Sequence, residues 1–258
     1  MTEPQTSPDT TRRSGARDGT AVVHHALREA ILRGEIAAGT SLSQVKIAKD
    51  FGISRGPVRE ALRLLQREGL IEAELNRRVR VAHFSVEDLE QLYATRVVVE
   101  ALAISVSVPR FTAEDLTALN RALADMDRLA GHDVERWDEV HRGFHLALVA
   151  HAGERMVRLI EQLVDHAERY RRVYIARDPR AWSVGAAEHA EIVAACVDSD
   201  ASLAAALLAR HLSRTALTVF MLSAPEYDPA TLRAAIGQAT SAAQSQPAAG
   251  VRLPATSG

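Results

Sequence analysis

The chain has a single cysteine, Cys196, among its 258 residues, so an internal disulfide cannot form. Cys196 lies in an apolar run typical of a helix, and we interpret it as a small buried hydrophobic side chain in a reducing compartment. No apolar run approaches the roughly 20 residues of a membrane-spanning helix. The first 20 residues lack the apolar core of a secretory signal. These absences predict a cytoplasmic protein without a membrane partner.

The sequence also lacks catalytic motifs. It contains no nucleophile motif and no phosphate-binding loop. The run His-Arg-Gly-Phe-His at 141–145 has no glutamate in the position of H-E-x-x-H, so the general base of a zinc protease is absent. We therefore expect that the protein is not an enzyme. Its length leaves room for two domains that each have a core.

The net charge of −2 is divided unevenly along the chain. Residues 21–82 contain 11 Lys+Arg and 7 Asp+Glu, which gives +4, whereas residues 83–258 contain 17 and 23, which gives −6. A basic segment suits contact with nucleic-acid phosphates, and an acidic one does not. The charge therefore favours a nucleic-acid partner for the first segment only.

Composition and periodicity divide the chain into four parts. Residues 1–20 are polar and rich in Ser, Thr, Pro and Gly, and we interpret them as a disordered arm. We expect a winged helix-turn-helix over 21–82 and an all-α helical bundle over 83–225. Residues 226–258 combine a helix over Thr231–Ser241, either packed on the bundle or free, with a disordered tail. The fold class is thus mainly α.

The segment from Leu42 to Ala82 carries the most specific pattern. An apolar helix, Val45–Phe51, runs into a Gly-Ile-Ser turn and then into a second helix. Gly52 allows the positive φ that ends the first helix. Ser54 is a suitable N-cap, whose oxygen can accept a backbone N–H, and Pro57 stands in the first turn of the second helix.

The second helix has two distinct faces. Val58, Leu62 and Leu65 fall on an apolar face at helical spacing. Arg55, Arg59 and Arg63 follow another face, four residues apart. A helix that reads DNA needs this combination, because apolar residues hold it while donors reach base edges and phosphates. An amphipathic hairpin with a solvated basic face is the alternative.

Two short strand-like runs follow, Leu70–Ala73 and Val79–Ala82, around a basic turn. Arginines at the tip of such a turn suit a minor-groove or phosphate contact. The strands and the turn correspond to a wing behind the helix-turn-helix.

Together these motifs resemble the GntR family of bacterial regulators. The resemblance runs from about Val22 to Ala82 and rests on L-S-Q-V-x-I-A, G-I-S-R-x-P-V-R-E-A-L-R-x-L, E-G-L-I and the basic wing. It implies DNA contacts from both the recognition helix and the wing, made by Ser54, Arg55, Gly56, Arg59, Asn76, Arg77 and Arg78. Family members often carry a larger residue where Gly56 stands, so base readout there is weak or is made by the backbone.

The rest of the chain reads as successive helices without a convincing strand. They are expected at about 85–107, 112–130, 134–151, 154–176, 181–198 and 201–222. Two histidines, His141 and His145, are four residues apart, so both can reach one metal ion from one helix face. His189 and His211 lie on later helices. A single histidine would more often be an ordinary core or surface residue, which is how we interpret the other six.

Three runs around these histidines resemble the FCD domain of the FadR-type GntR subfamily over about 85–222. They are V-H-R-G-F-H-L-A-L, E-H-A-E-I-V-A-A-C and A-L-L-A-R-H-L. The resemblance implies a metal held by His141, His145, His189 and His211. Such domains usually have a carboxylate or amide ligand where His141 stands, and a four-nitrogen set favours Zn²⁺, with Ni²⁺ or Cu²⁺ as alternatives. Asp138, one turn earlier, is a candidate for orienting an imidazole.

The same resemblance implies a small carboxylate effector near the metal. A carboxylate is well bound by a bidentate arginine, and Arg96 matches an arginine that recurs in the first helix of this domain. Arg171 and Tyr174, which cluster with Tyr170 and Arg172, are further candidates, with a solvated basic face as the alternative.

These features predict a ligand-responsive transcriptional repressor. Two chains would form a homodimer that sets two recognition helices on a palindromic operator. The effector would shift the bundle and release the DNA. A metal-sensing regulator and a metal-dependent enzyme with an appended DNA-binding domain are the alternatives.

Overall fold

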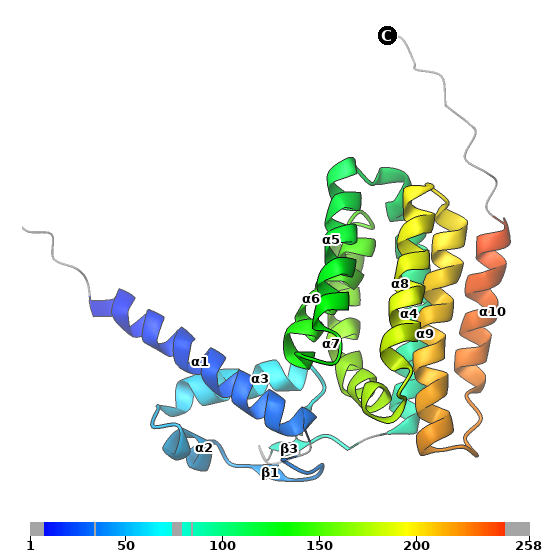
Figure 1. Ribbon diagram of the computed structural model, residues 1–258. Coiled ribbons are helices and arrows are strands. Elements are labelled where there is room, and N and C mark those ends of the chain that lie inside the picture. The colour runs from blue at the N-terminus through cyan, green and yellow to red at the C-terminus, as the bar shows by residue number, and fades with distance from the viewer. Residues whose placement is uncertain (1–7, 34, 74–78, 84, 246–258) are drawn as a thin grey trace, which may run out of the picture. The chain divides into compact units, whose positions relative to one another are not determined.

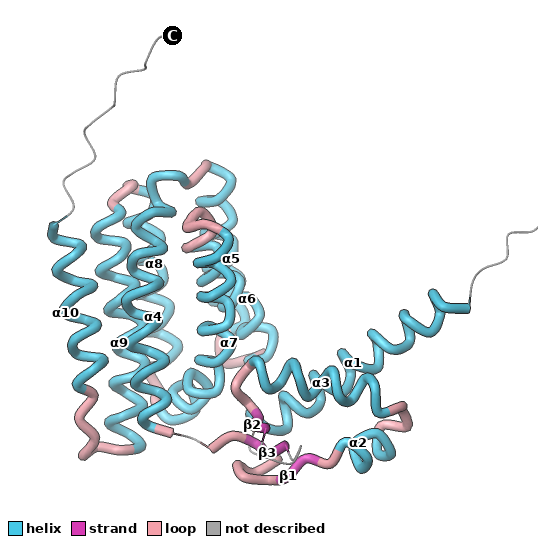
Figure 2. Tube along the Cα trace, turned by 180° about the vertical axis from the view of Figure 1, so that it is seen from behind, coloured by secondary structure: helices cyan, strands magenta, loops and turns pink. Residues whose placement is uncertain are grey.

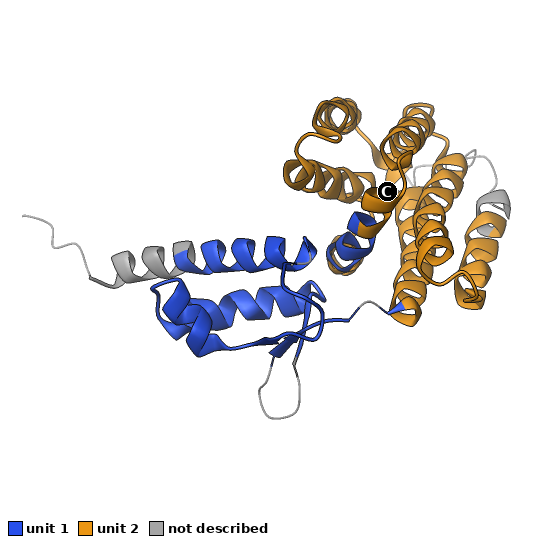
Figure 3. Cartoon of the chain, turned by 60° about the horizontal axis from the view of Figure 1, so that its bottom comes forward, with its two compact units in different colours: residues 1–85, 165–172 blue, residues 86–164, 173–258 orange. Residues whose placement is uncertain are grey.

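The structure, a computed structural model, describes residues 8–33, 35–73, 79–83 and 85–245. The chain divides into two compact units (Figure 3). The first comprises residues 1–85 together with 165–172, and the second comprises residues 86–164 together with 173–258. The division after residue 85 falls close to the domain boundary expected after residue 82.

The N-terminal unit combines helices with a small sheet (Figures 1 and 2). Its helices are α1 (Pro8–Leu32), α2 (Gln44–Asp50) and α3 (Arg55–Arg67), and its strands are β1 (Ser41–Leu42), β2 (Ile71–Ala73) and β3 (Val79–Val81). The strands form an antiparallel sheet in the order β1-β3-β2. The sequence predicts β2 and β3 but not β1, because two residues are too few to show an alternating pattern.

Helix α1 begins earlier than expected. Residues 8–20, which the sequence predicts to be a disordered arm, form its first turns. After Pro8 the segment has no proline until after Leu32, so every backbone N–H beyond the first turn can join the helical ladder. Helix formation is cooperative, and residues 22–32 supply a stable end from which it extends.

The core of this unit holds one face of α3. Apolar residues from all three helices, from β2 and from the residue before it bury their side chains together: Val23, Leu27, Ile47, Ala48, Val58, Ala61, Leu62, Leu65, Leu70 and Ile71. The apolar face predicted for α3 is therefore its buried face, and its arginines lie on the other side.

The C-terminal unit is a bundle of helices that lie side by side (Figure 1). They are α4 (Val86–Ser107), α5 (Ala113–Leu129), α6 (Val134–Leu148), α7 (Glu154–Arg177), α8 (Ala181–Val197), α9 (Ala201–Ser223) and α10 (Ala230–Ser245), with a 3₁₀ turn, η1, at Val108–Arg110. Helix α4 packs mainly against α9 and α10, while α5 packs against α6 and α8.

Helix α4 is the apolar centre of the bundle. Together with η1 it is long and apolar enough to cross a membrane, since an 18-residue window within it has a mean hydropathy of 1.4. This finding corrects the expectation that no apolar segment approaches that length. Of its apolar window, 67% is buried inside the bundle. Burial of this kind identifies α4 as a core helix, because its apolar surface is already covered by α9 and α10.

Helix α10 packs on the bundle, which settles the choice left open for the C-terminal helix. Leu232, Ala235 and Ala239 are buried on its inner face. Glu90 of α4 accepts hydrogen bonds from the backbone N–H groups of Thr231 (2.6 Å) and Leu232 (3.2 Å). The Glu90 carboxylate therefore caps the N-terminus of α10 from a neighbouring helix.

Candidate functional site

The helix-turn-helix forms as its turn residues dictate. Gly52 has φ +64°, which the glycine accommodates without strain, and it separates α2 from α3. Ser43 caps α2 through a hydrogen bond that it accepts from the N–H of Lys46 (3.3 Å). Val58 and Leu65 of α3 are fully buried in the core of the unit, and this packing fixes the position of the helix.

Ser54 occupies the N-cap position of α3 but makes no capping hydrogen bond through its side chain, contrary to the expectation from the sequence. An N-cap side chain accepts from the second or third residue of the helix. Here the third residue is Pro57, which has no N–H, and only Gly56 remains. The exposed hydroxyl of Ser54 is therefore left available to an outside partner.

The other residues assigned to the recognition helix, Arg55, Gly56 and Arg59, are also exposed. Together with Ser54 they surround the N-terminus of α3, where backbone N–H groups lack intrahelical acceptors. A side chain at Gly56 would meet only the Ser54 hydroxyl oxygen, 3.9 Å away, so glycine leaves the backbone accessible there. This end of α3 offers both side-chain and backbone donors to an anion.

The wing residues Asn76, Arg77 and Arg78 lie outside the described residues, and their contacts stay predictions. The strands that carry the turn are in place, with Ile71 opposite Val81 and Glu72 opposite Arg80. Arg80 on β3 is exposed. It adds a basic side chain beside the wing that the sequence pattern did not single out.

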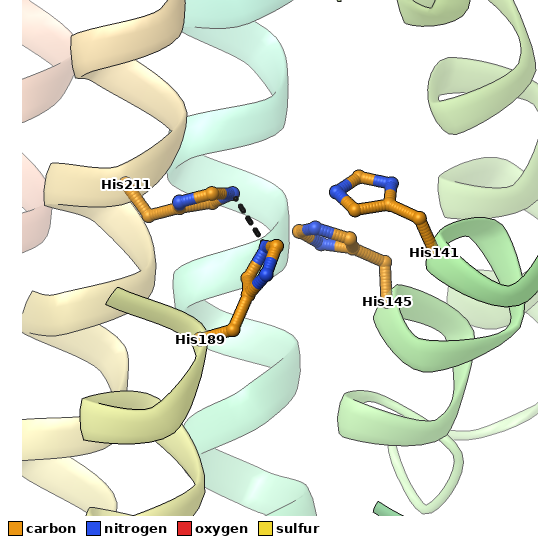
Figure 4. A group of neighbouring side chains, drawn as sticks. All are labelled: His141, His145, His189 and His211. Atoms are coloured by element: carbon orange, nitrogen blue, oxygen red, sulfur yellow. Dashed lines mark hydrogen bonds between the residues drawn. The ribbon is translucent and has the colours of Figure 1, made fainter. Parts of the chain in front are cut away.

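The four histidines of the predicted metal site come together in the bundle (Figure 4). His141 and His145 project from α6, His189 from α8 and His211 from α9. All four are buried, and one ring nitrogen from each lies within 4.8 Å of the others. The i, i+4 spacing on α6 thus places both of its imidazoles against those of two later helices.

Two carboxylates border the cluster. Glu188 accepts a hydrogen bond from Nδ1 of His211 (2.8 Å), so Nε2 is the nitrogen of His211 that faces His189. A carboxylate hydrogen-bonded behind a metal-binding histidine fixes its tautomer and ring orientation in this way. Glu100 lies 3.7 Å from Nδ1 of His145, beyond hydrogen-bond distance.

One pair of nitrogens in the cluster has the spacing expected around a bound transition metal. Nε2 of His189 and Nε2 of His211 are 3.2 Å apart, close to the ~3.3 Å between two nitrogens that bind one Zn²⁺ at about 2.0–2.1 Å in tetrahedral geometry. Nε2 of His145 is buried and has no hydrogen-bond partner among the described residues. A buried polar atom without a partner is costly, and a metal ligand would not have this cost.

Burial keeps two of these imidazoles neutral. Burial lowers the pKa of His145 to about 4 and also lowers the pKa of His211. Burial raises the pKa of Glu188, but hydrogen bonds from His211 and Arg214 outweigh it and bring that pKa to about 2. At neutral pH His145 and His211 are therefore unprotonated, and His211 lies beside the charged carboxylate of Glu188. Unprotonated imidazole is the state that binds a metal cation.

Arg96, predicted to hold an effector, lies in a buried ion pair. Its Nε donates to Glu100 at 2.6 Å, and both side chains are almost fully buried, with Arg96 3% and Glu100 0% exposed. Burial raises the pKa of Glu100, but the charge of Arg96 beside it, with smaller contributions from His145, outweighs this and lowers it. Arg96 is therefore linked to the histidine cluster through Glu100.

Tyr174 and Arg171 have different surroundings. The hydroxyl of Tyr174 accepts a hydrogen bond from Arg214, and Arg214 in turn binds both carboxylate oxygens of Glu188 at 2.8 Å. Tyr174 thus connects to the cluster through two further side chains. Arg171 is buried in the stretch of α7 that belongs to the N-terminal unit. Asp138 is buried on α6, one turn before His141.

Three charged residues of this network were not singled out from the sequence: Glu100, Glu188 and Arg214. Glu188 directly precedes His189 and Arg214 stands three residues after His211, so both lie beside predicted ligands. That proximity was the only signal for them. Glu100 is 45 residues from His145, and nothing in the sequence joins the two.

Comparison with known families gives two matches. The model of the bacterial regulatory proteins of the gntR family matches residues 20–81, and the FCD domain model matches residues 91–214. The first contains α3 and the wing. The second contains all four histidines.

Individual proteins agree with these matches. The chain is 28% identical to the HTH-type transcriptional repressor GlaR of Escherichia coli over 197 residues, 72% of this chain and 89% of that protein. It is 28% identical to the regulator YdhC of Bacillus subtilis over 55% of this chain and 65% of that protein. A crystal structure of a regulator from Rhodococcus sp. RHA1 has a TM-score of 0.62 and 27% identity over 81% of this chain and 99% of its own.

Proposed function

The chain belongs to the GntR family of bacterial transcriptional regulators and carries a C-terminal FCD domain, and from this we propose that it is a repressor released from its operator by a small carboxylate bound near a metal in the bundle. Members of this family bind DNA and are not enzymes, which excludes the metal-dependent enzyme. GlaR is named a transcriptional repressor, and we propose the same sign of regulation for this protein.

The DNA-binding part of the proposal rests on the exposed N-terminal end of α3. Ser54, Arg55 and Arg59 are exposed there above a buried apolar face. A recognition helix enters the major groove with this end, where arginine binds guanine edges bidentately and backbone N–H groups bind phosphate. Asn76, Arg77 and Arg78 are proposed to contact DNA from the wing.

We infer a homodimer on a palindromic operator from the limited reach of a single copy. Family members typically act as dimers. One winged helix-turn-helix buries a small surface on DNA, and two copies on two half-sites supply the specificity that one lacks. The modest charge of +4 in residues 21–82 agrees with dependence on a second copy.

The metal part rests on the four buried imidazoles, two of which have lowered pKa values, and on the carboxylate hydrogen-bonded to His211. His141, His145, His189 and His211 would hold a divalent transition metal, Zn²⁺ in the first place and Ni²⁺ or Cu²⁺ as alternatives. When bound, the ion supplies a positive charge to which the oxygen of a carboxylate effector can bind.

The effector part of the proposal concerns three side chains near the histidine cluster or on α7. Arg96, Arg171 and Tyr174 are the proposed contacts. The Glu100 carboxylate already holds Arg96 at 2.6 Å, so an effector must share this arginine or exchange with Glu100. Tyr174 reaches the cluster through Arg214 and Glu188, a path along which a ligand could act on the histidine positions.

The DNA-binding proposal is tested by footprinting on the region upstream of the gene for this protein. Arg55→Ala and Arg59→Ala should weaken protection, since each removes a charged donor from the N-terminal end of α3. Arg67→Ala is the matched control, because this arginine is exposed at the opposite end of the same helix. A footprint that neither N-terminal substitution alters would refute the proposal.

A metal-sensing regulator is the second candidate, favoured by the four-nitrogen ligand set. Titrating Zn²⁺ against operator affinity, with and without a panel of organic acids, separates the two. The proposed repressor loses DNA affinity only when an acid is added. A metal sensor changes its DNA affinity with Zn²⁺ alone, and that result would replace the effector proposal.

A further inference from the structure

The C-terminal unit contains a cavity that borders the histidine cluster on the side of α5, α6 and α8. It measures about 380 Å³, within the range of roughly 300–1,000 Å³ typical of small-molecule sites. Its walls are one face of α5, one face of α8 and a tryptophan of α6. The tryptophan of α6 is Trp137, and Trp182 and His189 line the cavity from α8.

Small residues create this space. Ala186 and Ala190 are one turn apart on α8, and Ala124 faces the cavity from α5. Helix interfaces are normally filled to the density of a crystal by interdigitating side chains. All three alanines are exposed, so the cavity opens to solvent and a ligand can enter it.

The inner wall is aromatic. The rings of Trp137 and Trp182 meet edge to face, with centroids 4.9 Å apart and an interplanar angle of 88°. Trp137 also stacks on His141, at 4.5 Å and 23°. Trp137 therefore touches the cavity on one side and a proposed metal ligand on the other. His189 belongs to both the cavity lining and the histidine cluster.

The polar groups of the cavity are few. Among its lining residues, Asn120 and Asp127 are exposed and His189 is buried. A ligand with many hydroxyl groups would leave most of them without partners against Leu123, Met126 and the alanines, which disfavours it. The Asp127 carboxylate also repels an anionic group nearby.

We propose that this cavity binds the aromatic ring of an aryl carboxylate, whose acid group lies toward His189 and the histidine cluster. The assignment of an acid group rests on the proposed function. The assignment of an aromatic ring rests on the cavity itself. A flat ring can join the edge-to-face arrangement of Trp137 and Trp182 at favourable centroid distances. The effector class is thereby narrowed from small carboxylates in general to aromatic ones.

Tryptophan fluorescence tests this directly, because the two tryptophans of the chain both line the cavity. Zinc-loaded protein is titrated with phenylacetate, with cyclohexylacetate as a saturated acid of similar size, and with gluconate as a polyhydroxy acid. We expect a saturable emission change with phenylacetate, weaker binding of cyclohexylacetate, and no saturable change with gluconate. Gluconate or cyclohexylacetate binding as tightly as phenylacetate would overturn the proposal.

A filling substitution locates the ring. Ala190→Leu places extra carbon atoms in the cavity and should weaken phenylacetate binding by about tenfold or more. Ala194→Leu is the matched control, since Ala194 is exposed one turn further along α8 and does not line the cavity. Ala186→Leu replaces Ala190→Leu if the latter does not fold. Unchanged phenylacetate binding in the filled variant would overturn the proposal.

Sedimentation and operator affinity distinguish a ligand cavity from a subunit contact and from a cavity that does not control DNA binding. If Ala190→Leu disrupts the dimer in sedimentation and leaves phenylacetate binding intact, the cavity is a subunit contact and the proposal fails. Operator affinity is measured on the same samples. If phenylacetate binds in the cavity but does not release DNA, the cavity assignment holds and the proposed effector role fails. If gluconate releases DNA and phenylacetate does not bind, the effector role of a carboxylate holds and the cavity assignment fails.

Discussion

The charged residues of α3 and those of the bundle differ in a way that separates two kinds of site. Arg55 and Arg59 are exposed, and neither has an ion-pair partner among the described residues. Arg96 and Glu100 are almost fully buried and hold each other at 2.6 Å. Glu188 is also buried and binds both His211 and Arg214. Arg55 and Arg59 of α3 thus remain unpaired among the described residues, whereas the buried charges of the bundle are paired with each other.

The difference follows from the cost of desolvation. A charge taken out of water is stable only if it is paired and hydrogen-bonded, so the buried charges form a fixed frame around the histidines. An exposed arginine keeps its water, and it can exchange that water for a phosphate or a base at little cost. The frame suits a metal centre, which needs fixed ligands. The open surface suits a partner that arrives from outside.

The largest effect should come from breaking the frame. Glu100→Ala leaves Arg96 buried without its carboxylate, and the free energy of unfolding should fall by about 3–5 kcal/mol. Glu60→Ala is the control: it removes the exposed Glu60–Arg63 pair, 3.5 Å long, and should cost less than about 1 kcal/mol. Urea denaturation measures both. Equal decreases in the free energy of unfolding of the two variants would contradict the proposed difference between buried and exposed ion pairs.

A smaller effect is expected at the open surface. Arg59→Ala should weaken operator binding by about 1–3 kcal/mol, because a bidentate base contact is lost. Its stability should stay within about 0.5 kcal/mol of wild type, because the side chain is exposed and is not paired with another described residue. Fluorescence anisotropy gives the first value and urea denaturation the second. If Arg59→Ala lowers stability and leaves DNA affinity unchanged, Arg59 has a structural role and does not contact DNA.

The outer carboxylate should affect metal affinity without abolishing it. Glu188→Gln weakens the orientation of His211 and should lower Zn²⁺ affinity by about 10- to 100-fold in calorimetric titrations. Glu191→Gln is the matched control, since Glu191 stands one turn along α8 in an exposed pair with Arg210. If both variants bind Zn²⁺ alike, Glu188 does not orient a ligand.

The smallest effect concerns the cap of α10. Burial raises the pKa of Glu90, but hydrogen bonds from Tyr227, Leu232 and Thr231 overcome this and lower it below its ordinary value of 4.5. A carboxyl with a lowered folded-state pKa stabilises the fold above its unfolded pKa, and this contribution is lost as the pH falls through the folded value. Glu90→Gln should cost about 1 kcal/mol at pH 7 and should remove this part of the acid dependence.

Hydrogen exchange of the first turns of α10 provides the measurement for this last prediction. Wild type should exchange faster below about pH 4.5 than at neutral pH, after correction for intrinsic rates, and Glu90→Gln should exchange fast at both. Protection of α10 that is the same in both proteins would show that Glu90 does not hold the helix.

The sequence predicts features that depend on neighbouring residues. The boundaries of α2 and α3 follow from Gly52, Ser54 and an apolar repeat, and all of these signals lie within 25 residues. The capping hydrogen bond predicted for Ser54 was wrong, because Pro57 has no N–H at the third helical position. The i, i+4 spacing of His141 and His145 predicts that both lie on one helix face.

Features made by packing between distant segments were not predictable in this way. The Arg96–Glu100 pair is local, but the approach of Glu100 to His145 depends on how α4 meets α6. The tryptophan-lined cavity depends on alanines of two helices that are more than 60 residues apart. The helical state of residues 8–20 was missed because their composition resembles that of disordered segments.

The metal content of purified protein, measured together with its operator affinity, tests the central claim that an independent metal centre lies behind the DNA-binding surface. Wild type should hold one Zn²⁺ per chain. A variant with both His141→Ala and His211→Ala should hold none after dialysis, while His132→Ala, at an exposed histidine, should match wild type. Without an effector, all three should bind the operator with affinities within about threefold of each other. Full zinc retention in the double variant, or no zinc in wild type, would contradict the account.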